Sequence, residues 1–467
     1  MGINTVVNRV EENPVGRAAG PVVRVITLCD SFSWENITFR RGDSFRARVC
    51  VDLITAKAAG RVYFNYPRCP ERKPADGVRI LYTGTKNAEH LPRPDYGKAW
   101  TPLVPRCVPA IFPGPVAEKI VAADPDFQIL DSTGIYVGGN AQVGDFDSDI
   151  APLLPERPRI LFIRDNGAGD VIMSVPAVRE FKRRFPLSSI TYATLPRHKC
   201  LLRGVACIDR VISVHGEMRL DRPGFDLVVN WAGALENYSL ERNRGPRIDS
   251  FSKHLGLGPL GNKETELHLD EFNIVRAECL LGGAPPKNPG QLLIGYVMQA
   301  AAWNRSWPIE RVPDLCRLFA RALPDCKIVL IDSQADAGFD APNVINTCGG
   351  THSFMDAAAV CSLCHLVITQ DTGLAHACGA LGVPALVLIG SMIPEWRFSS
   401  YKNFHWILPS DRVPCSPCLD WQRRYDSGPD RGAFMSCAGD RRNRCLEAIS
   451  PDEICMKARE IIAGSNR

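Results

Sequence analysis

Two successive series of strand and helix patterns constrain this chain more than any other feature. From Arg159 the first series reads "RILFIRD", "VPAVREFKRRF", "SITYATL", "RVISVHG" and "FDLVVNW". The second series begins with "QLLIGYVMQ" and ends with "PALVLIG". Strands that alternate with helices predict a parallel sheet covered by helices. We therefore expect an α/β protein with two Rossmann-like domains facing a cleft, and ligands bound beyond the carboxyl ends of the strands.

The rest of the sequence predicts a further unit before these two. At 467 residues the chain is long enough for about three domains of roughly 150 residues each. The stretch from Val22 to about Tyr66 is β-like, and proline-rich and glycine-rich sequence follows it. We predict an N-terminal β-rich domain with an irregular extension over 1–156, a first Rossmann-like domain over 157–288 and a second over 289–467.

Composition excludes several classes of protein. The net charge of +4 is small for this length and does not indicate a nucleic-acid partner. No apolar run approaches the roughly 18 residues that span a bilayer, so we expect no stable membrane insertion. The start "MGINTVVNRVEENPVGRAAG" lacks the apolar core of a signal peptide. These features predict a cytoplasmic protein.

The turn after the first strand, "NGAGD", is glycine-rich but is not a dinucleotide fingerprint. Gly167 and Gly169 fit the first two glycines of that fingerprint, whereas Ile172 replaces the third. These glycines predict a tight turn and a close approach by a ligand. Asp170 lies at the predicted start of a helix, where the helix dipole keeps its carboxylate ionised. Such a group repels a pyrophosphate but can accept a proton from a hydroxyl; the alternative is that it only caps the helix.

The turn "QDTGLAH" in the second series has the features of an anion site. Asp371, Thr372 and Gly373 follow a strand and open a helix, so they offer a hydroxyl and free backbone N–H groups to a diphosphate. His376 lies one helical turn further and can face the same ligand. The alternative is a capped helix with a core histidine.

The segment "AAWNRSWP" places Arg305 after the first strand of the second series. A guanidinium at a strand end can neutralise a departing diphosphate with paired donors. The alternative is a solvated loop arginine.

Four cysteines near the end of the chain have the spacing of a metal site. "CSPC" contains Cys415 and Cys418, and Cys437 and Cys445 follow. A CxxC turn presents two thiolates to one tetrahedral ion, and two later cysteines close the shell. We predict a structural metal finger over 413–447, for which the spacing alone indicates zinc.

Other cysteines read as small core residues, because Cys316 and Cys378 lie inside apolar runs. "CSLCH" at 361–365 matches a haem attachment sequence, but it lies in an apolar helical pattern and no export signal is evident. We therefore expect these thiols to be buried and to carry no haem.

Four ordered motifs together resemble the heptosyltransferases of glycosyltransferase family nine. They are "ILFIRDNGAGDVIMSVPAVREFKRRFP", "NRSWP", "VITQDTGLAHACGALGVPALVLIG" and "RCLEAISPDEI", within about 159–460. The resemblance implies a GT-B fold, inversion at the sugar carbon and no catalytic metal. It makes residues 157–288 the acceptor-side domain and 289–467 the nucleotide-sugar-binding domain.

The resemblance also implies roles for single residues. Asp170 matches the general base, and Asp371, Thr372, Gly373 and His376 match the nucleotide-sugar site. Arg305 stands where the family more often has lysine, which keeps the charge but changes the geometry. The family's acidic ribose-binding residue has only weak candidates here, Asp332 and Asp336.

The additional N-terminal domain and the cysteine finger are similar to those of the bacterial autotransporter heptosyltransferases. That resemblance implies ADP-heptose as donor, serine hydroxyls of an autotransporter protein as acceptor, iron in the finger and a homo-oligomeric assembly. One alternative is a heptosyltransferase of the lipopolysaccharide core, for which "RHK" at 197–199 could contact an anionic lipid. Another is a catalytically silent binding or assembly protein that keeps the fold.

Overall fold

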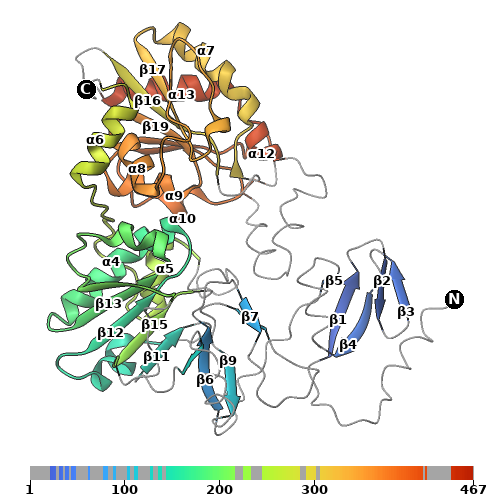
Figure 1. The fold of residues 1–467 in the computed structure, drawn as a ribbon, viewed down its shortest axis with the longest axis vertical. Coiled ribbons are helices and arrows are strands. Elements are labelled where there is room, and N and C mark those ends of the chain that lie inside the picture. Colours follow the sequence, from blue (N-terminus) through green and yellow to red (C-terminus); the bar gives the residue numbers. More distant parts are fainter. Residues whose placement is uncertain are drawn as a thin grey trace. The chain divides into compact units, whose positions relative to one another are not determined.

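The computed structural model describes residues 143–215, 224–232, 244–283, 291–300, 305–413, 416–417 and 443–465, together with strands and one further residue before residue 143. Contacts between Cα atoms divide the chain into two compact units. One comprises Met1–Asp131 with Trp421–Met435, and the other comprises Ser132–Asp420 with Ser436–Arg467. The ribbon in Figure 1 carries the element labels used below.

The first unit contains short strands, and the pairings between its described strands are antiparallel. β1 (Val22–Thr27) pairs with β4 (Ser44–Arg48) and β5 (Val62–Tyr63), and β2 (Ser31–Trp34) pairs with β3 (Ile37–Arg40). The others are β6 (Gly77–Tyr82), β7 (Ala88–His90), β8 (Leu103–Pro105), β9 (Ala110–Pro113) and β10 (Phe127–Ile129). Strands are thus present where the sequence predicts β-structure, while the domain as a whole stays a prediction.

The first parallel sheet has five strands in the order β11-β15-β12-β13-β14. Four of them fall in the predicted alternation: β12 (Arg159–Ile163), β13 (Ser189–Thr194), β14 (Arg210–Ser213) and β15 (Leu227–Asn230). The fifth, β11 (Ile135–Gly138), pairs in parallel with β15. This sheet therefore includes a strand that lies before the boundary expected at residue 157.

Helices and short turns surround this sheet. They are α3 (Phe146–Asp149), η2 (Ala151–Leu153), α4 (Ala168–Arg184), η3 (Pro196–Leu202) and α5 (Arg247–His254). The next helix, α6 (Glu271–Leu280), packs against α8 (Phe354–Ser362) of the second half. Phe162 of β12, Phe181 of α4 and Trp231 pack ring against ring in its core. Figure 1 shows α4 and α5 beside the carboxyl end of β12.

The second parallel sheet has six strands in the order β18-β17-β16-β19-β20-β21. Numbered from its own first strand, this is the order 3-2-1-4-5-6 of dinucleotide-binding folds, in which the strand order reverses between the first and fourth strands while all strands stay parallel. The strands are β16 (Leu292–Val297), β17 (Cys326–Ile331), β18 (Val344–Asn346), β19 (Leu366–Gln370), β20 (Ala385–Leu388) and β21 (Phe404–Ile407).

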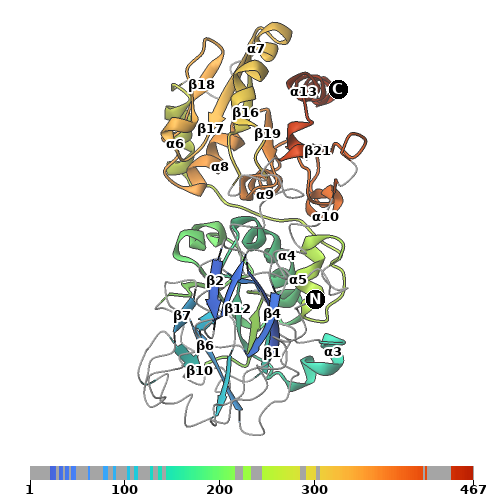
Figure 2. The same ribbon diagram turned by 90° about the vertical axis from the view of Figure 1, so that its right-hand side faces the viewer.

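The helices of this half cover both faces of the sheet. They are η6 (Ile309–Arg311), α7 (Val312–Ala322), η7 (Ala335–Ala337), α8 (Phe354–Ser362), α9 (Gly373–Ala380), α10 (Pro394–Phe398), α12 (Arg444–Glu447) and α13 (Pro451–Ser465). Figure 2 shows α7 and α13 away from α8 and α9. Alternate residues of β16, Ile294 and Tyr296, share one core cluster with α7 and α13, as the period of a strand requires.

The sequence interpretation of the cysteines agrees with this core. Cys316 is 2% exposed and Cys378 is fully buried. Cys361 and Cys364 of "CSLCH" are also buried, and burial raises the pKa of the Cys364 thiol well above its usual value. Their predicted burial is confirmed. Among the described residues no helix is both long enough and apolar enough to cross a membrane.

The segment that carries Arg305 is hydrogen-bonded to residues 443–449 near the end of the chain. The buried indole of Trp307 donates to the Ile449 carbonyl at 3.0 Å, and Arg311 Nη1 donates to the Glu447 carbonyl at 2.6 Å. Asn443 Nδ2 donates to the Ser306 carbonyl at 3.1 Å. Residues 443–449 therefore hold the loop that follows β16.

We expect Trp307→Phe to lower the free energy of unfolding by about 1–3 kcal/mol, because the Ile449 carbonyl loses its shorter hydrogen bond and keeps only the 3.4 Å bond from Arg311 Nη1. Urea unfolding measures this change. Trp406→Phe on β21 is the control, since that half-buried indole donates no hydrogen bond among the described residues. Equal losses in the two variants would contradict the role of the Trp307 hydrogen bond.

Candidate active site

Asp170 is the third residue of α4, and its carboxylate is held by two arginines. Gly167 occupies the N-cap position with a φ of 78°, so the tight glycine turn predicted from the sequence is present. Arg164 Nη2 donates to Asp170 Oδ2 at 2.6 Å, and Arg247 Nε donates to Oδ1 at 3.1 Å. Because the carboxylate is paired with guanidinium groups and Gly167 is the N-cap, Asp170 does not cap the helix.

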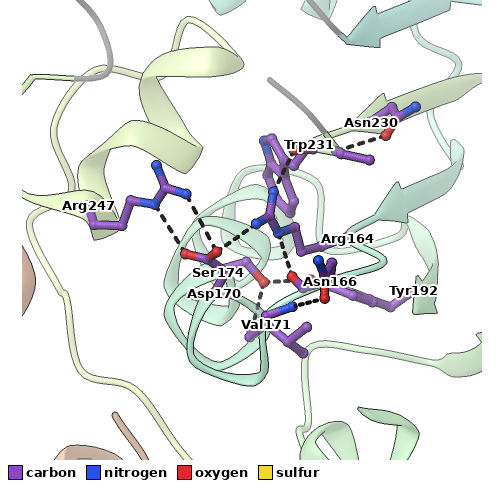
Figure 3. A network of polar contacts seen from close by, with 11 residues as sticks. Arg164, Asn166, Asp170, Val171, Ser174, Tyr192, Asn230, Trp231 and Arg247 are labelled. Atoms are coloured by element: carbon purple, nitrogen blue, oxygen red, sulfur yellow. Dashed lines mark hydrogen bonds and ion pairs between the residues drawn. The ribbon is translucent and has the colours of Figure 1, made fainter. Parts of the chain in front are cut away.

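The two arginines that contact Asp170 come from different elements: one follows a strand of the first sheet, and the other begins a helix. Arg164 follows β12, and its Nη1 also donates to the Trp231 carbonyl beyond the end of β15 at 2.9 Å. Arg247 is the first residue of α5. Figure 3 shows the two guanidinium groups on opposite sides of the carboxylate. β12 and β15 are neighbours at the point where the strand order reverses, which is the usual ligand-binding position in such sheets.

The Asp170 carboxylate is ionised at neutral pH. Burial alone would raise its pKa, but the positive charges of Arg247, Arg164 and Arg397 outweigh burial and hold the pKa well below its usual range. Both arginines that contact it have side chains only 4% exposed. A buried, oriented carboxylate in the first turn of a helix can accept a hydrogen bond and then a proton from a hydroxyl.

The second turn of interest opens α9 after β19. Thr372 is the N-cap, and its hydroxyl accepts from the Ala375 N–H at 3.3 Å. Gly373 begins the helix, and His376 is 3% exposed. The interpretation as a capped helix with a buried histidine therefore describes the local structure. The first N–H groups of α9 nevertheless point from a positive helix end, which suits an anion.

Arg305 lies at this same turn. Its Nη1 donates to the Asp371 carbonyl at 3.0 Å and lies 3.8 Å from Asp371 Oδ2. Burial would raise the pKa of Asp371, but Arg397 and Arg305 lower it below its usual value. Arg305 follows β16 and Asp371 follows β19, the two strands at the reversal point of the second sheet. The structure thus brings these residues, which are distant in sequence, together.

The two turns are in contact. A Cβ atom added to Gly169 would lie 2.4 Å from His376 Cδ2, so only a glycine fits there. A Cβ atom on Gly373 would lie 3.2 Å from the Ala168 Cβ. His376 is thus the residue that lies against Gly169, while the predicted approach of a ligand to the "NGAGD" glycines stays a prediction.

Three arginines of the site were not found from the sequence. Arg164 lies inside the first motif, and its position directly after a predicted strand could have indicated that it belongs to the site. Arg247 and Arg397 lie outside the motifs that indicated the site. The weak ribose candidate Asp332 accepts from the Gln334 N–H in a turn, and the side chain of Asp336 lies outside the described residues.

Most of the predicted metal finger lies outside the described residues, including Cys415, Cys418 and Cys437. Cys445 is described and buried, and its thiol donates to Asn443 Oδ1 at 3.2 Å. No group of three possible metal ligands occurs in the part of the chain that the structure describes. The finger therefore stays a prediction.

Several solved structures resemble this chain at low identity. One is a glycosyl transferase of family 9 from Veillonella parvula DSM 2008, with 18% identity, 66% of this chain and 97% of that chain covered, and a TM-score of 0.49. The E. coli ADP-heptose lps heptosyltransferase II has 14% identity, 66% and 100% coverage and a TM-score of 0.47. The iron-containing dodecameric glycosyltransferase TibC from enterotoxigenic E. coli H10407 has 14% identity, 66% and 79% coverage and a TM-score of 0.48.

No curated protein sequence matches the chain. A family model does match it: residues 291–427 correspond to Glycosyltransferase family 9 (heptosyltransferase). This range contains Arg305 and the turn from Asp371 to His376. The resemblance to this family is therefore confirmed over residues 291–427, which contain two of the four motifs, "NRSWP" and "VITQDTGLAHACGALGVPALVLIG".

Proposed function

We propose that this protein is an inverting heptosyltransferase of the GT-B type, which transfers heptose from ADP-heptose to serine hydroxyls of a protein acceptor such as an autotransporter. The observation that carries the proposal is the meeting of two turns with complementary chemistry. Asp170 offers a proton acceptor at the start of α4, and Arg305 with the start of α9 offers an anion site. The family match over the second half supports the nature of the donor.

In the proposed reaction, an acceptor hydroxyl oxygen bonds to the anomeric carbon while the bond from that carbon to the diphosphate breaks. The electron pair of the broken bond stays on the departing ADP, and the hydroxyl proton moves to Asp170. Attack opposite the leaving group inverts the configuration. A single displacement needs one base and one anion site, which is the set of groups that the two turns supply.

The low pKa of Asp170 affects the stage of the reaction at which the acceptor hydroxyl loses its proton. A carboxylate held by Arg164 and Arg247 is a weak base, so it takes the proton late, after the new carbon–oxygen bond has made the hydroxyl acidic. Its ionised state is preserved throughout the neutral range. The two arginines also fix the direction of its oxygens.

Arg305 and the N–H groups at Gly373 and beyond stabilise the charge that gathers on the diphosphate. Arg397 adds a third source of positive charge close to both Asp170 and Asp371. We propose no catalytic metal, in keeping with the family resemblance. Guanidinium groups supply paired donors that match phosphate oxygens.

The choice of a protein acceptor rests on the parts of the chain outside the two parallel sheets. Antiparallel strands precede the first sheet, and cysteines at metal-ligand spacing lie near the end of the chain. These are the features that resemble the autotransporter heptosyltransferases. We also propose, on that resemblance, a cytoplasmic homo-oligomer.

Two described residues of the predicted finger, Ser416 and Cys445, lie near Gly390. Ser416, inside the CxxC turn, donates through its hydroxyl to the Gly390 carbonyl at 2.6 Å. The Cys445 thiol lies against the same glycine, since a Cβ atom there would overlap its sulfur. Ser416 and Cys445 thus lie against the same glycine, which supports a proposal that cysteines near them in sequence share one ion. We propose that Cys415, Cys418, Cys437 and Cys445 hold one ion, iron by resemblance and zinc by spacing alone.

The acceptor is tested by incubating purified protein with ADP-heptose and candidate passenger proteins, then measuring intact mass. We expect the mass of one or more heptose residues on serine. Labelling of a lipopolysaccharide core in place of protein would favour the first alternative. Absence of transfer to either acceptor, with ADP-heptose still bound, would favour a catalytically silent protein.

Asp170→Asn should reduce transfer by roughly 10²–10⁴-fold while ADP-heptose binding changes little, because the amide keeps the shape but cannot accept the proton. Initial rates and calorimetric binding separate the two effects. Asp314→Asn, at an exposed carboxylate of α7, is the matched control and should leave both unchanged. Undiminished turnover in Asp170→Asn would refute the base assignment.

Cys418→Ser should lower the metal content from about one ion per chain, because the tetrahedral shell loses a thiolate. Elemental analysis of the purified protein measures this, and size-exclusion chromatography reports any loss of assembly. Cys279→Ser removes an exposed thiol on α6 and serves as the control. Metal content equal to wild type in Cys418→Ser would exclude the finger.

A further inference from the structure

His376 has one fixed ring orientation between the two turns. Its ring stacks on Phe398 of α10, with centroids 5.4 Å apart and planes inclined by 27°. On another side lies the backbone of α4, since a Cβ atom at Gly169 would be 3.2 Å from His376 Nε2. The Nε2 edge of the imidazole therefore faces the residue that precedes Asp170.

The other nitrogen of the ring is bonded to a tyrosine. His376 Nδ1 lies 2.9 Å from the hydroxyl oxygen of Tyr401. Tyr401 is 9% exposed and packs over α9, where a Cβ atom at Gly379 would overlap its ring. One side chain thus contacts two consecutive turns of α9 and orients the histidine between them.

The protonation states decide the direction of this hydrogen bond. Burial lowers the pKa of His376 to about 4, so the imidazole is neutral and has one donor and one acceptor nitrogen. Burial raises the pKa of the Tyr401 phenol, which keeps its proton. A neutral phenol is a stronger hydrogen-bond donor than acceptor, and the unprotonated nitrogen of a neutral imidazole is a strong acceptor. The Tyr401 proton is therefore directed to Nδ1.

We propose that Tyr401 is a positioning residue that fixes His376 as its Nε2–H tautomer and so presents an N–H donor where α4 and α9 meet. Resting on the proposed function, we assign this donor to a phosphate oxygen of the bound nucleotide. The N–H adds to the backbone donors at the start of α9 and costs no reorganisation when the leaving group departs.

The tautomer is measured directly by nitrogen-15 NMR of full-length protein labelled at histidine, with the signal assigned by its loss in His376→Gln. We expect Nδ1 to have the shift of an unprotonated nitrogen and Nε2 that of a protonated one. The opposite pattern in the wild type would overturn the proposal. In Tyr401→Phe the two shifts should move toward each other as the tautomers mix, and unchanged shifts would equally refute it.

ADP alone is the probe for the phosphate contact. We expect ADP to shift the Nε2 signal, and Tyr401→Phe to weaken ADP binding roughly tenfold. Tyr296→Phe is the matched control, because that buried phenol lies near Gln370 and should leave ADP affinity unchanged. Equal ADP affinity in wild type and Tyr401→Phe would overturn the assignment to phosphate.

Two substitutions of the histidine itself distinguish its nitrogens. The amide of His376→Gln reaches the position of Nε2, whereas that of His376→Asn reaches the position of Nδ1. We expect His376→Gln to bind ADP more tightly than His376→Asn, and the reverse order would contradict the proposal. These measurements need no acceptor, so a failure of heptose transfer and a failure of the tautomer assignment are read from different experiments.

Discussion

The pairing of Asp170 with Arg164 and Arg247 is the interaction on which the rest of the first half depends. A carboxylate taken out of water is stable only when hydrogen-bonded cations replace its solvent. Arg164 comes from a strand end, and Arg247 comes from a helix that begins 77 residues after Asp170. Satisfying this one group therefore requires β12, α4 and α5 to meet at a single point, which is also the reversal point of the sheet.

The sequence predicted most of the two parallel sheets, because buried strands between amphipathic helices have a period that local sequence reveals. It also predicted the two turns, since "NGAGD" and "QDTGLAH" place glycine and polar residues where a strand gives way to a helix. β11 was missed because it lies in sequence with no clear period. It joins the sheet by pairing with β15, a contact that only the tertiary structure defines.

The polar partners within the site were harder to predict. Arg247 and Arg397 carry no local signal, because an arginine bound to a distant carboxylate looks like any surface arginine in the sequence. Tyr401 is similar: its ring fits over Gly379 and its hydroxyl meets His376 only after α9 has formed. Side chains that act through a contact between distant segments are set by packing, and spacing along the chain does not reveal them.

Gly390 has a consequence for the polar segment between the last two groups of cysteines. Ser416 and Cys445 both lie against this glycine, so these two positions of the sequence are held at one place. The entropy of closing a loop grows only slowly with its length when its ends are already held together. A change in the number of residues between these two positions therefore carries only a small cost in closure entropy.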